Sequence, residues 1–546
     1  MASDNAVAPA PGDLSAFADT VLGPQHKSLP PAAWGLTVRE YLATAPHLDD
    51  LQTPVLTIDR AALDNNRAVM ADWADAAGMK LAPHGKTTMS PQLWREQLEA
   101  GSWGITLATG WQAQVGRSFG LNRIMLANAL LDPAGIRWAA EEIAADPTFE
   151  LYSWVDSVAS VREMERHLES APEGVRLSVL VELGGPHGRT GARGLAAAHE
   201  VADAVHKSPR LMLAGVGGYE GALAHDRTPA GLATVRQYLD ELSILHRELA
   251  DSGRYDEFVT VPGDVAGASS GDDAVVAGAG DGSESGAGVP RGGSGAPGDV
   301  DAGPMRAAAD ESEQPGRDVR SVCGEAGDPV TEPTRTGATD NDSGRVDAAR
   351  AGDGHSPSRI VRRSAIVTAG GSAYPDLVVE RLGALADEAG AQGVPTTVVL
   401  RSGAYLVHDD GFYSGISPLA QGVAEHPLRS AMHGWARSVS RPETELALLD
   451  AGKRDLPFDE GLPVPQLVAG PVAPELPAGA HVSALNDQHA FLRLPGGGDA
   501  DVPVGSVVRL GLSHPCTAFD KWRLIPVIDD AGAERPRVVD FLHTFF

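Results

Sequence analysis

Short runs of apolar and β-branched residues alternate along most of the chain with longer segments whose apolar residues recur at helical spacing. The runs occupy residues 55–59, 80–84, 103–109, 123–128, 149–156, 176–184, 211–221 and 364–372. The segment between the first two runs follows a helical period and ends at Gly78, a residue suited to a helix C-terminus. Eight strands alternating with helices predict an α/β fold, a (β/α)8 TIM-type barrel. A doubly wound parallel sheet stays open as an alternative, because a count of strands does not show closure.

The pattern changes after residue 390. Extended runs then follow one another with turn residues between them and little helical periodicity, as in HVSALNDQHAFLRL and GSVVRLGL. Such a succession is typical of antiparallel β structure. The sequence therefore predicts a barrel over residues 51–390 and an antiparallel β domain over 391–546, while residues 1–50 form an N-terminal segment compatible with either part.

One segment inside the barrel range differs in composition from the rest. Residues 261–358 are dominated by Gly, Ala, Ser, Asp and Pro and contain no aromatic residue. A stretch of this kind cannot bury enough apolar surface to offset its chain entropy. We expect a disordered low-complexity insertion in a barrel loop.

Charge and composition narrow the classes of partner. The 546 residues carry a formal net charge of −29, which argues against a basic surface for nucleic acid or anionic membranes. No apolar run is long enough for a bilayer span, and the N-terminus lacks the pattern of a secretory signal. The two cysteines, Cys323 and Cys516, have unrelated flanks and do not suggest a disulfide framework. We expect a cytoplasmic protein without nucleic-acid or membrane partners.

The stretch KLAPHGKTTMSP places Lys86 just after the second run. Three interpretations compete for it. A phosphate-binding loop needs a glycine where this chain has Lys80, so that motif fails. A solvated lysine is the default for any isolated lysine. A lysine that forms a Schiff base with an aldehyde cofactor is the third interpretation, and it depends on what the other strand ends carry.

Those other strand ends carry suitable residues. The last run is followed by Gly370, Gly371 and Ser372, which offer free N–H groups and a hydroxyl where barrels often bind phosphate. A tight turn would need the same glycines. The sixth run ends near His187 and Arg189, and an arginine there is able to hydrogen-bond a cofactor oxygen. Tyr219, after the seventh run, is placed to stack on a ring or to serve only the core.

His514 and Cys516 form a second candidate site within GLSHPCTAFDKWR. In a strand, residues two apart point to the same face, so imidazole and thiolate would be able to share one metal ion. Both are preferred zinc ligands, and a pair leaves positions open for water or substrate. A buried cysteine beside a capping histidine explains the same spacing without a metal.

Taken together, these motifs resemble a known family. PHGKTTMSPQLWREQLEAGSWGITLAT, VELGGPHGRTG, GVGGYEG, VTAGGSAYPD and LSHPCTAFDKWR are similar to fold-type III, alanine-racemase-like pyridoxal-phosphate enzymes, and within them to the D-serine dehydratase / D-threonine aldolase branch, often labelled amino acid deaminase. The resemblance runs from residue 50 to the C-terminus, apart from the insertion. Gly85, the insertion and the segment 401–417 depart from the family pattern.

The resemblance implies roles for the candidate residues. Lys86 would carry pyridoxal 5′-phosphate, Arg189 would face its phenolic oxygen, and Tyr219 would lie near its ring. The turn Gly370–Ser372, including Gly371, would hold the phosphate, and His514 with Cys516 would bind Zn²⁺. A homodimer with active sites at its interface is implied as well.

The resemblance also implies a reaction. Dehydratases of this branch tend to have a cysteine at the position of Cys516 and aldolases an aspartate, which favours α,β-elimination of D-serine, D-threonine or a similar small-molecule D-amino acid to a 2-oxo acid and ammonia. Retro-aldol cleavage to glycine and an aldehyde would use the same parts. A non-catalytic pyridoxal-phosphate-binding barrel is the alternative of another class, and the β domain with its H-x-C pair speaks against it.

Overall fold

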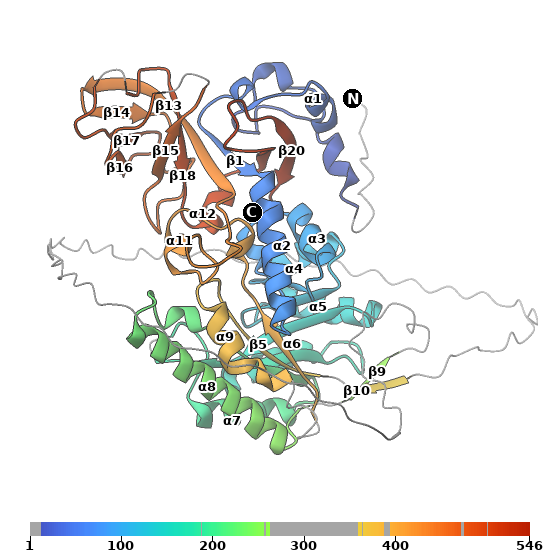
Figure 1. The fold of residues 1–546 in the computed structure, drawn as a ribbon. Coiled ribbons are helices and arrows are strands. Elements are labelled where there is room, and N and C mark those ends of the chain that lie inside the picture. Colours follow the sequence, from blue (N-terminus) through green and yellow to red (C-terminus); the bar gives the residue numbers. More distant parts are fainter. Residues whose placement is uncertain are drawn as a thin grey trace, which may run out of the picture. The chain divides into compact units, whose positions relative to one another are not determined.

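The structure, a computed structural model, describes residues 13–186, 188–255, 258–261, 359–362, 364–386, 394–470, 474–498 and 501–546. The insertion predicted over 261–358 lies, apart from its first residue, outside the described residues, as do Cys323 and His187. The described chain forms a parallel sheet with helices on its outer side and a separate antiparallel sheet (Figure 1).

Eight parallel strands follow one another in chain order around the first sheet. They are β2 (Lys80–Leu81), β3 (Ile105–Leu107), β4 (Arg123–Leu126), β5 (Glu150–Val155), β6 (Leu177–Gly184), β8 (Leu211–Gly218), β11 (Ala365–Ala369) and β12 (Thr396–Leu400). A parallel bridge between His84 and Thr106 joins the first strand to the second. Because β12 also pairs with β2, the sheet closes on itself. The predicted (β/α)8 barrel is confirmed, and the doubly wound alternative is wrong.

Two strands differ from the prediction. β1 (Val55–Asp59), expected as the first barrel strand, pairs instead with strands of the antiparallel sheet. The eighth barrel strand is β12, which lies beyond residue 390 and therefore outside the predicted barrel range of 51–390. Both segments are short apolar runs, so their periodicity does not tell which sheet they join. Because β1 is not part of the barrel, each later strand stands one place earlier in the barrel than predicted. Lys86 therefore follows the first barrel strand, and Gly370–Ser372 follows the seventh.

Helices cover the outside of the barrel, as Figure 1 shows for α7, α8 and α9. In chain order they are α2 (Arg60–Ala76), α3 (Pro91–Glu99), α4 (Gly110–Ser118), α5 (Pro133–Ala145), α6 (Val158–Leu168), α7 (Leu195–His206), α8 (Pro229–Asp251) and α9 (Pro375–Leu382). Side-chain caps begin several of them; Asp132 and Thr228, for example, each accept from the backbone N–H three residues on. α2 precedes β2 and lies beside the loop after β12, where Asn66 Nδ2 donates to Leu406 O at 3.0 Å.

Large side chains fill the inside of the barrel. A cluster distinct from the main core takes residues from seven of the strands and their ends: Ala82, Met125, Tyr152, Trp154, Leu180, Ala214, Ile366 and Val399. All are less than a tenth exposed. The barrel is therefore packed with side chains below its mouth, as in other barrels of this type.

The second sheet has nine strands. They are β1, β13 (Met432–Glu443), β14 (Leu446–Leu449), β15 (Val464–Val468), β16 (His481–Leu485), β17 (Ala490–Arg493), β18 (Val507–Gly511), β19 (Leu524–Ile528) and β20 (Val538–His543). All pairs are antiparallel except β1 with β19. The described part of the N-terminal segment packs here: α1 (Val38–Ala43) places Tyr41 6.1 Å from the ring of Phe541.

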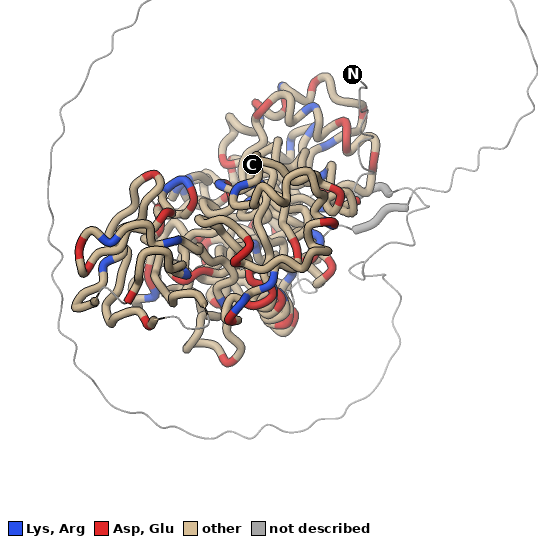
Figure 2. The backbone as a smooth tube through the Cα atoms, turned by 90° about the horizontal axis from the view of Figure 1, so that it is seen from above, with Lys and Arg blue, Asp and Glu red and all other residues tan. Residues whose placement is uncertain are grey.

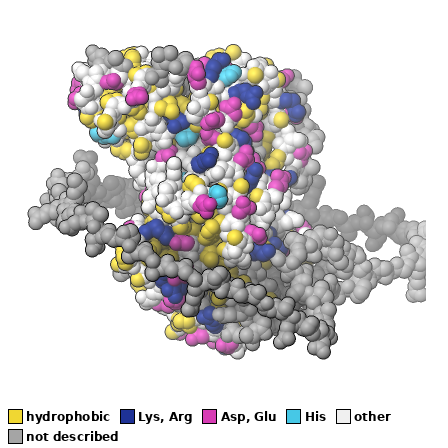
Figure 3. Space-filling model, viewed as in Figure 1, with side chains coloured by type: hydrophobic (Ala, Val, Ile, Leu, Met, Phe, Trp, Pro, Cys, Tyr) yellow, Lys and Arg dark blue, Asp and Glu magenta, His cyan; other side chains and the backbone are white. Residues whose placement is uncertain are grey.

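The surface of the described part carries both signs of charge. Basic positions are interspersed with acidic ones along the backbone (Figure 2), and on the face in Figure 3 hydrophobic side chains lie among charged ones. Some charges form local clusters, such as Arg60 with Asp64 and Glu96. Among the helices of the described ranges, none combines the length and the apolar character needed to cross a membrane.

Candidate active site

Lys86 lies in a single turn, η4 (Gly85–Thr87), directly after the first barrel strand. The turn is anchored from the next helix, because Trp94 Nε1 donates to Gly85 O at 3.0 Å. The Lys86 side chain is half-buried, in contrast to the solvated lysine considered from the sequence. The loop therefore holds this amine at the carboxyl end of the barrel, where barrel enzymes place their chemistry.

The surroundings of Lys86 favour its neutral form. Burial is the largest cause that lowers the pKa of Lys86, and the charges of Arg189 and Arg401 lower it further. The charge of Cys516 acts in the opposite direction. A lysine with a lowered pKa is suited to attack a carbonyl carbon and to exchange protons.

Two guanidinium groups lie near this amine. Arg189 lies over the ring of Tyr219 at 5.2 Å. Arg401 is fully buried, lies over Trp154 at 4.5 Å and donates to Gly218 O. Burial lowers the pKa of Arg401. These groups provide positive charge for an anionic ligand at the barrel mouth.

The glycine turn after β11 binds an anion of the protein itself. Gly370 N donates to Glu220 Oε2 at 3.0 Å and Gly371 N to Glu220 Oε1 at 2.6 Å. Ser372 Oγ accepts from Ala404 N at 3.1 Å, which ties the seventh strand's loop to the eighth's. The two N–H groups thus point to one place, which the buried carboxylate group of Glu220 occupies. That this turn holds a phosphate stays a prediction.

The H-x-C pair has a different backbone from the predicted strand. β18 ends at Gly511, and Cys516 lies in the helix α12 (Pro515–Phe519). His514 precedes that helix in the left-handed region at φ 57°. Proline at the first helical position stops strand pairing and favours the helix. The strand argument was therefore wrong, yet the helix start still brings imidazole and thiol within hydrogen-bond reach.

Interactions within this pair are strong. The hydrogen bond with Cys516 is the main cause that raises the pKa of His514 to about 9, with Asp459 adding to it. Burial alone would raise the pKa of the Cys516 thiol, but hydrogen bonds with His514 and Thr87 and the charge of Lys86 lower it. Cys516 Sγ lies 3.6 Å from Thr87 Oγ1, next to Lys86. The described residues hold no group of three or more His, Cys, Asp or Glu arranged for a metal.

Most predicted site residues therefore gather at one place. A Cβ at Gly371 would lie 3.1 Å from the Tyr219 ring. Burial is the main cause that raises the pKa of Tyr219, while the charges of Arg189 and Cys516 also act on it. The predicted lysine, arginine, tyrosine, glycine turn and H-x-C pair thus share one electrostatic environment.

Several residues of this environment were not predicted. Arg401 follows β12, and assigning that run to the barrel would have identified it. His84 has a pKa well below its ordinary value, first because of burial and then because of Arg401 and Lys86. Burial raises the pKa of Tyr413, and the charges of Tyr219 and Cys516 raise it further. No sequence pattern distinguishes this tyrosine.

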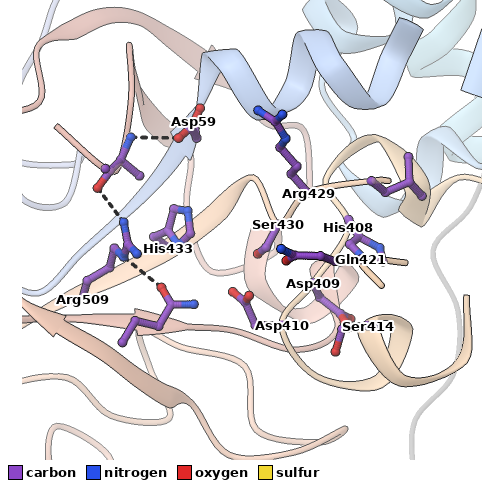
Figure 4. A pocket seen from close by; sticks show the side chains of 14 residues that line it. Asp59, His408, Asp409, Asp410, Ser414, Gln421, Arg429, Ser430, His433 and Arg509 are labelled. Carbon is purple, nitrogen blue, oxygen red and sulfur yellow. Dashed lines mark hydrogen bonds between the residues drawn. The ribbon is translucent and has the colours of Figure 1, made fainter. Parts of the chain in front are cut away.

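A separate cavity of about 270 Å³ opens next to Asp409 (Figure 4). Asp409 Oδ2 also accepts from His514 N at 3.1 Å, so the cavity adjoins the H-x-C loop without including Lys86. Among its polar side chains, Arg509 donates to Gln466 Oε1 at 2.9 Å and to Ala531 O at 2.6 Å. Three other lining atoms, Asp410 Oδ2, Ser430 Oγ and His433 Nδ1, are buried without a hydrogen-bond partner. We place the chemistry at Lys86 because the predicted site residues gather there, and neither Lys86 nor Arg189 nor Cys516 lines this cavity.

Comparisons with known proteins show what this chain is similar to. Residues 431–528 match the family model of a putative serine dehydratase domain, a range that contains His514 and Cys516. The chain is similar to 3-hydroxy-D-aspartate aldolase of Paracoccus denitrificans (28% identity over 219 residues, 38% of this chain and 56% of that protein) and to D-threonine aldolase of Arthrobacter sp. (25% over 199 residues, 36% and 51%). The matches thus span about half the length of these curated relatives.

Solved structures show the same fold. D-threonine aldolase from Filomicrobium marinum superimposes with a TM-score of 0.57 at 18% identity, covering 91% of this chain and 96% of that one. D-threo-3-hydroxyaspartate dehydratase from Delftia sp. HT23 gives 0.56 at 17%, covering 91% and 99%. An alanine-racemase-like protein from Idiomarina loihiensis gives 0.56 at 15%, covering 90% and 96%.

Proposed function

We propose that this chain, which has the alanine-racemase-like fold and carries a putative serine dehydratase domain, is a pyridoxal 5′-phosphate- and zinc-dependent lyase acting on D-β-hydroxy amino acids. One observation carries the proposal. The half-buried Lys86 of the barrel and the His514–Cys516 pair of the β domain come together, with Cys516 Sγ 3.6 Å from Thr87 Oγ1. An amine with a lowered pKa beside a histidine–cysteine pair suits the removal of a β-hydroxyl group.

The residues at the barrel mouth fit the cofactor. His84 Nδ1 and Arg401 Nε are buried without a hydrogen-bond partner, and such atoms call for a bound group. Lys86 would hold the cofactor, with Arg189 and Tyr219 beside it. The Gly370–Ser372 turn would bind the phosphate, which requires Glu220 to release the amides of Gly370 and Gly371.

The cofactor, when bound, supplies an aldehyde for amines and a ring that withdraws electrons from the substrate Cα. Lys86 would then take the proton from Cα, and burial, which lowers its pKa, makes the neutral form of the amine easier to reach. Because one lysine reaches Cα from one side, it would select the D configuration. Burial at the barrel mouth would keep water from this proton.

His514 and Cys516 would hold the zinc ion. Two protein ligands leave positions for water and for the substrate β-hydroxyl, and the metal would supply Lewis-acid help for the departure of hydroxide. The dehydratase of similar fold has been solved as a variant in a metal-free form, which supports a metal in that protein. We prefer α,β-elimination to a 2-oxo acid and ammonia because position 516 is a cysteine.

Retro-aldol cleavage is the second candidate. The curated relatives that match this chain are a 3-hydroxy-D-aspartate aldolase and a D-threonine aldolase. The same lysine and metal pair would serve that reaction, with the Cα–Cβ bond breaking instead of the Cβ–O bond. For either reaction we expect a cytoplasmic homodimer with a small D-amino acid as its partner.

The test is a product assay with D-serine, D-threonine and D-threo-3-hydroxyaspartate on the protein loaded with pyridoxal phosphate and zinc. We expect the wild type to release 2-oxo acid and ammonia and the loaded protein to absorb visible light. Lys86→Ala should lose both the product formation and the absorbance. Lys207→Ala, which changes an exposed lysine at the end of α7, is the matched control and should behave like the wild type. Glycine plus aldehyde would favour the aldolase, and colour retained in Lys86→Ala would refute the assignment of Lys86.

A further inference from the structure

Asp459 contacts both the imidazole of His514 and the helix α12 that follows it. Its Oδ2 lies 2.5 Å from His514 Nδ1. Its Oδ1 accepts from Thr517 Oγ1 at 2.7 Å, so both carboxylate oxygens have partners in the same short loop and helix. Thr517 therefore holds the carboxylate of Asp459 in place while that carboxylate contacts His514.

This contact determines which ring nitrogen of His514 is available. A carboxylate accepts hydrogen bonds, so Nδ1 carries the proton when it binds Asp459. When the ring gives up its second proton, Nε2 is the nitrogen left with a lone pair. The thiol of Cys516 lies within hydrogen-bond reach of the same imidazole. One tautomer is thereby selected for binding a metal beside the thiolate.

The backbone of His514 is held independently. Its left-handed φ of 57° is unusual for a residue other than glycine. His514 N donates to Asp409 Oδ2 at 3.1 Å, and the preceding Ser513 Oγ donates to Glu460 O at 2.7 Å. The ring and the main chain are thus fixed by two different carboxylates, Asp459 and Asp409.

We infer that Asp459 is a positioning residue for a metal at His514 and Cys516. It sets the tautomer of His514, orients the ring toward the thiolate and increases the basicity of the ligating nitrogen. Such outer carboxylates typically change metal affinity by about 10–100-fold. The inference rests on the proposed function, because it assumes that the pair binds zinc.

The experiment measures zinc affinity directly, by competition with a chromophoric chelator on the purified protein. We expect Asp459→Asn to raise the Kd for zinc by about 10–100-fold. Glu460→Gln is the matched control, because it removes the neighbouring carboxylate. The bond from Ser513 goes to the backbone oxygen of residue 460, so this substitution keeps it. Its Kd should stay that of the wild type. Melting curves without metal check that both variants fold.

A double-mutant cycle separates positioning from general charge. In a His514→Ala background, Asp459→Asn should change the remaining zinc affinity no further, because the residue acts through the imidazole. An equal loss in both backgrounds, or an unchanged Kd in the single variant, would overturn the inference. If the wild-type protein itself binds no zinc, the metal part of the proposed function fails instead.

Discussion

Gly85 has no room for a side chain, and this constraint bears on the lysine beside it. A Cβ at residue 85 would lie 2.5 Å from Trp94 Nε1 and 2.6 Å from Ile105 Cγ2. Both neighbours belong to packed elements, α3 and β3, and Trp94 is fully buried. The packing of this chain around residue 85 therefore requires the glycine that departs from the family motif.

We predict that Gly85→Ala lowers the free energy of unfolding by about 1–3 kcal/mol, as overpacking of a filled core does. It should also weaken binding of pyridoxal phosphate, because the turn that carries Lys86 has to shift. Gly415→Ala is the control, since a Cβ there meets no atom within 4 Å. Denaturant unfolding and a cofactor titration measure both effects, and equal stability of the two variants would contradict the packing argument.

At the same scale, the sequence identified residues whose chemistry is tied to a motif and missed those defined by packing. Lys86, Arg189 and Tyr219 stand at strand ends that periodicity reveals. Glu220 was overlooked because its partners, the amides of Gly370 and Gly371, are about 150 residues away in the chain. Contacts of that kind follow from closure of the barrel, which no local pattern encodes.

The elements themselves were easier to predict than their partners. β1 and β12 are both short apolar runs, and exchanging them leaves a count of eight unchanged. Pairing decides between them: β12 hydrogen-bonds to β11 and β2, whereas β1 pairs with β13 and β19. Strand propensity is a local property, but the choice of sheet depends on long-range closure.

Two buried histidines should make the free energy of unfolding depend on pH: His408, in the loop after β12, and His433, in β13. Burial lowers the pKa of His408 to about 4 and, with a contribution from Arg509, that of His433 to about 3. In the unfolded chain a histidine has a pKa of about 6.5. Below that value the unfolded state binds protons that the folded state does not, so the free energy of unfolding falls as pH falls.

We predict that each of these histidines lowers the free energy of unfolding by about 1.4 kcal/mol for each pH unit by which the pH falls from about 6 to about 4.5. Replacing one, as in His433→Gln, should make the decline shallower by that amount. His481→Gln, at an exposed position of β16, should leave the slope unchanged. Urea unfolding at several pH values tests this, and parallel declines in the wild type and His433→Gln would show that His433 is not responsible.

At the scale of the whole molecule, the candidate site needs both sheets. Lys86 comes from the barrel and Cys516 from the β domain, and α2 connects the two by following β1 directly and lying beside the loop after β12. The N-terminal segment strengthens the β domain, where Leu48 N donates to Pro536 O at 2.9 Å. The sequence predicted both parts but did not show that the H-x-C pair would meet the lysine turn.

The predicted insertion leaves and re-enters this assembly at one place. β9 (Phe258–Val261) and β10 (Arg359–Arg362) pair antiparallel, with Val261 opposite Arg359. The described residues up to 261 and from 359 onward belong to one compact unit, which contains Lys86, Arg189, Tyr219, Gly370–Ser372, His514 and Cys516. The ends of the chain on either side of the insertion are therefore already side by side.

We predict that deleting residues 268–356 leaves folding, melting temperature and the Lys86-dependent activity unchanged. Residues 262–267 and 357–358 then connect β9 to β10, and closing a short loop between paired strands costs little. A variant with the order of residues 268–356 shuffled is the control for composition and length. Loss of folding in both variants would show that this particular sequence packs against the barrel, and the barrel would then not be complete without it.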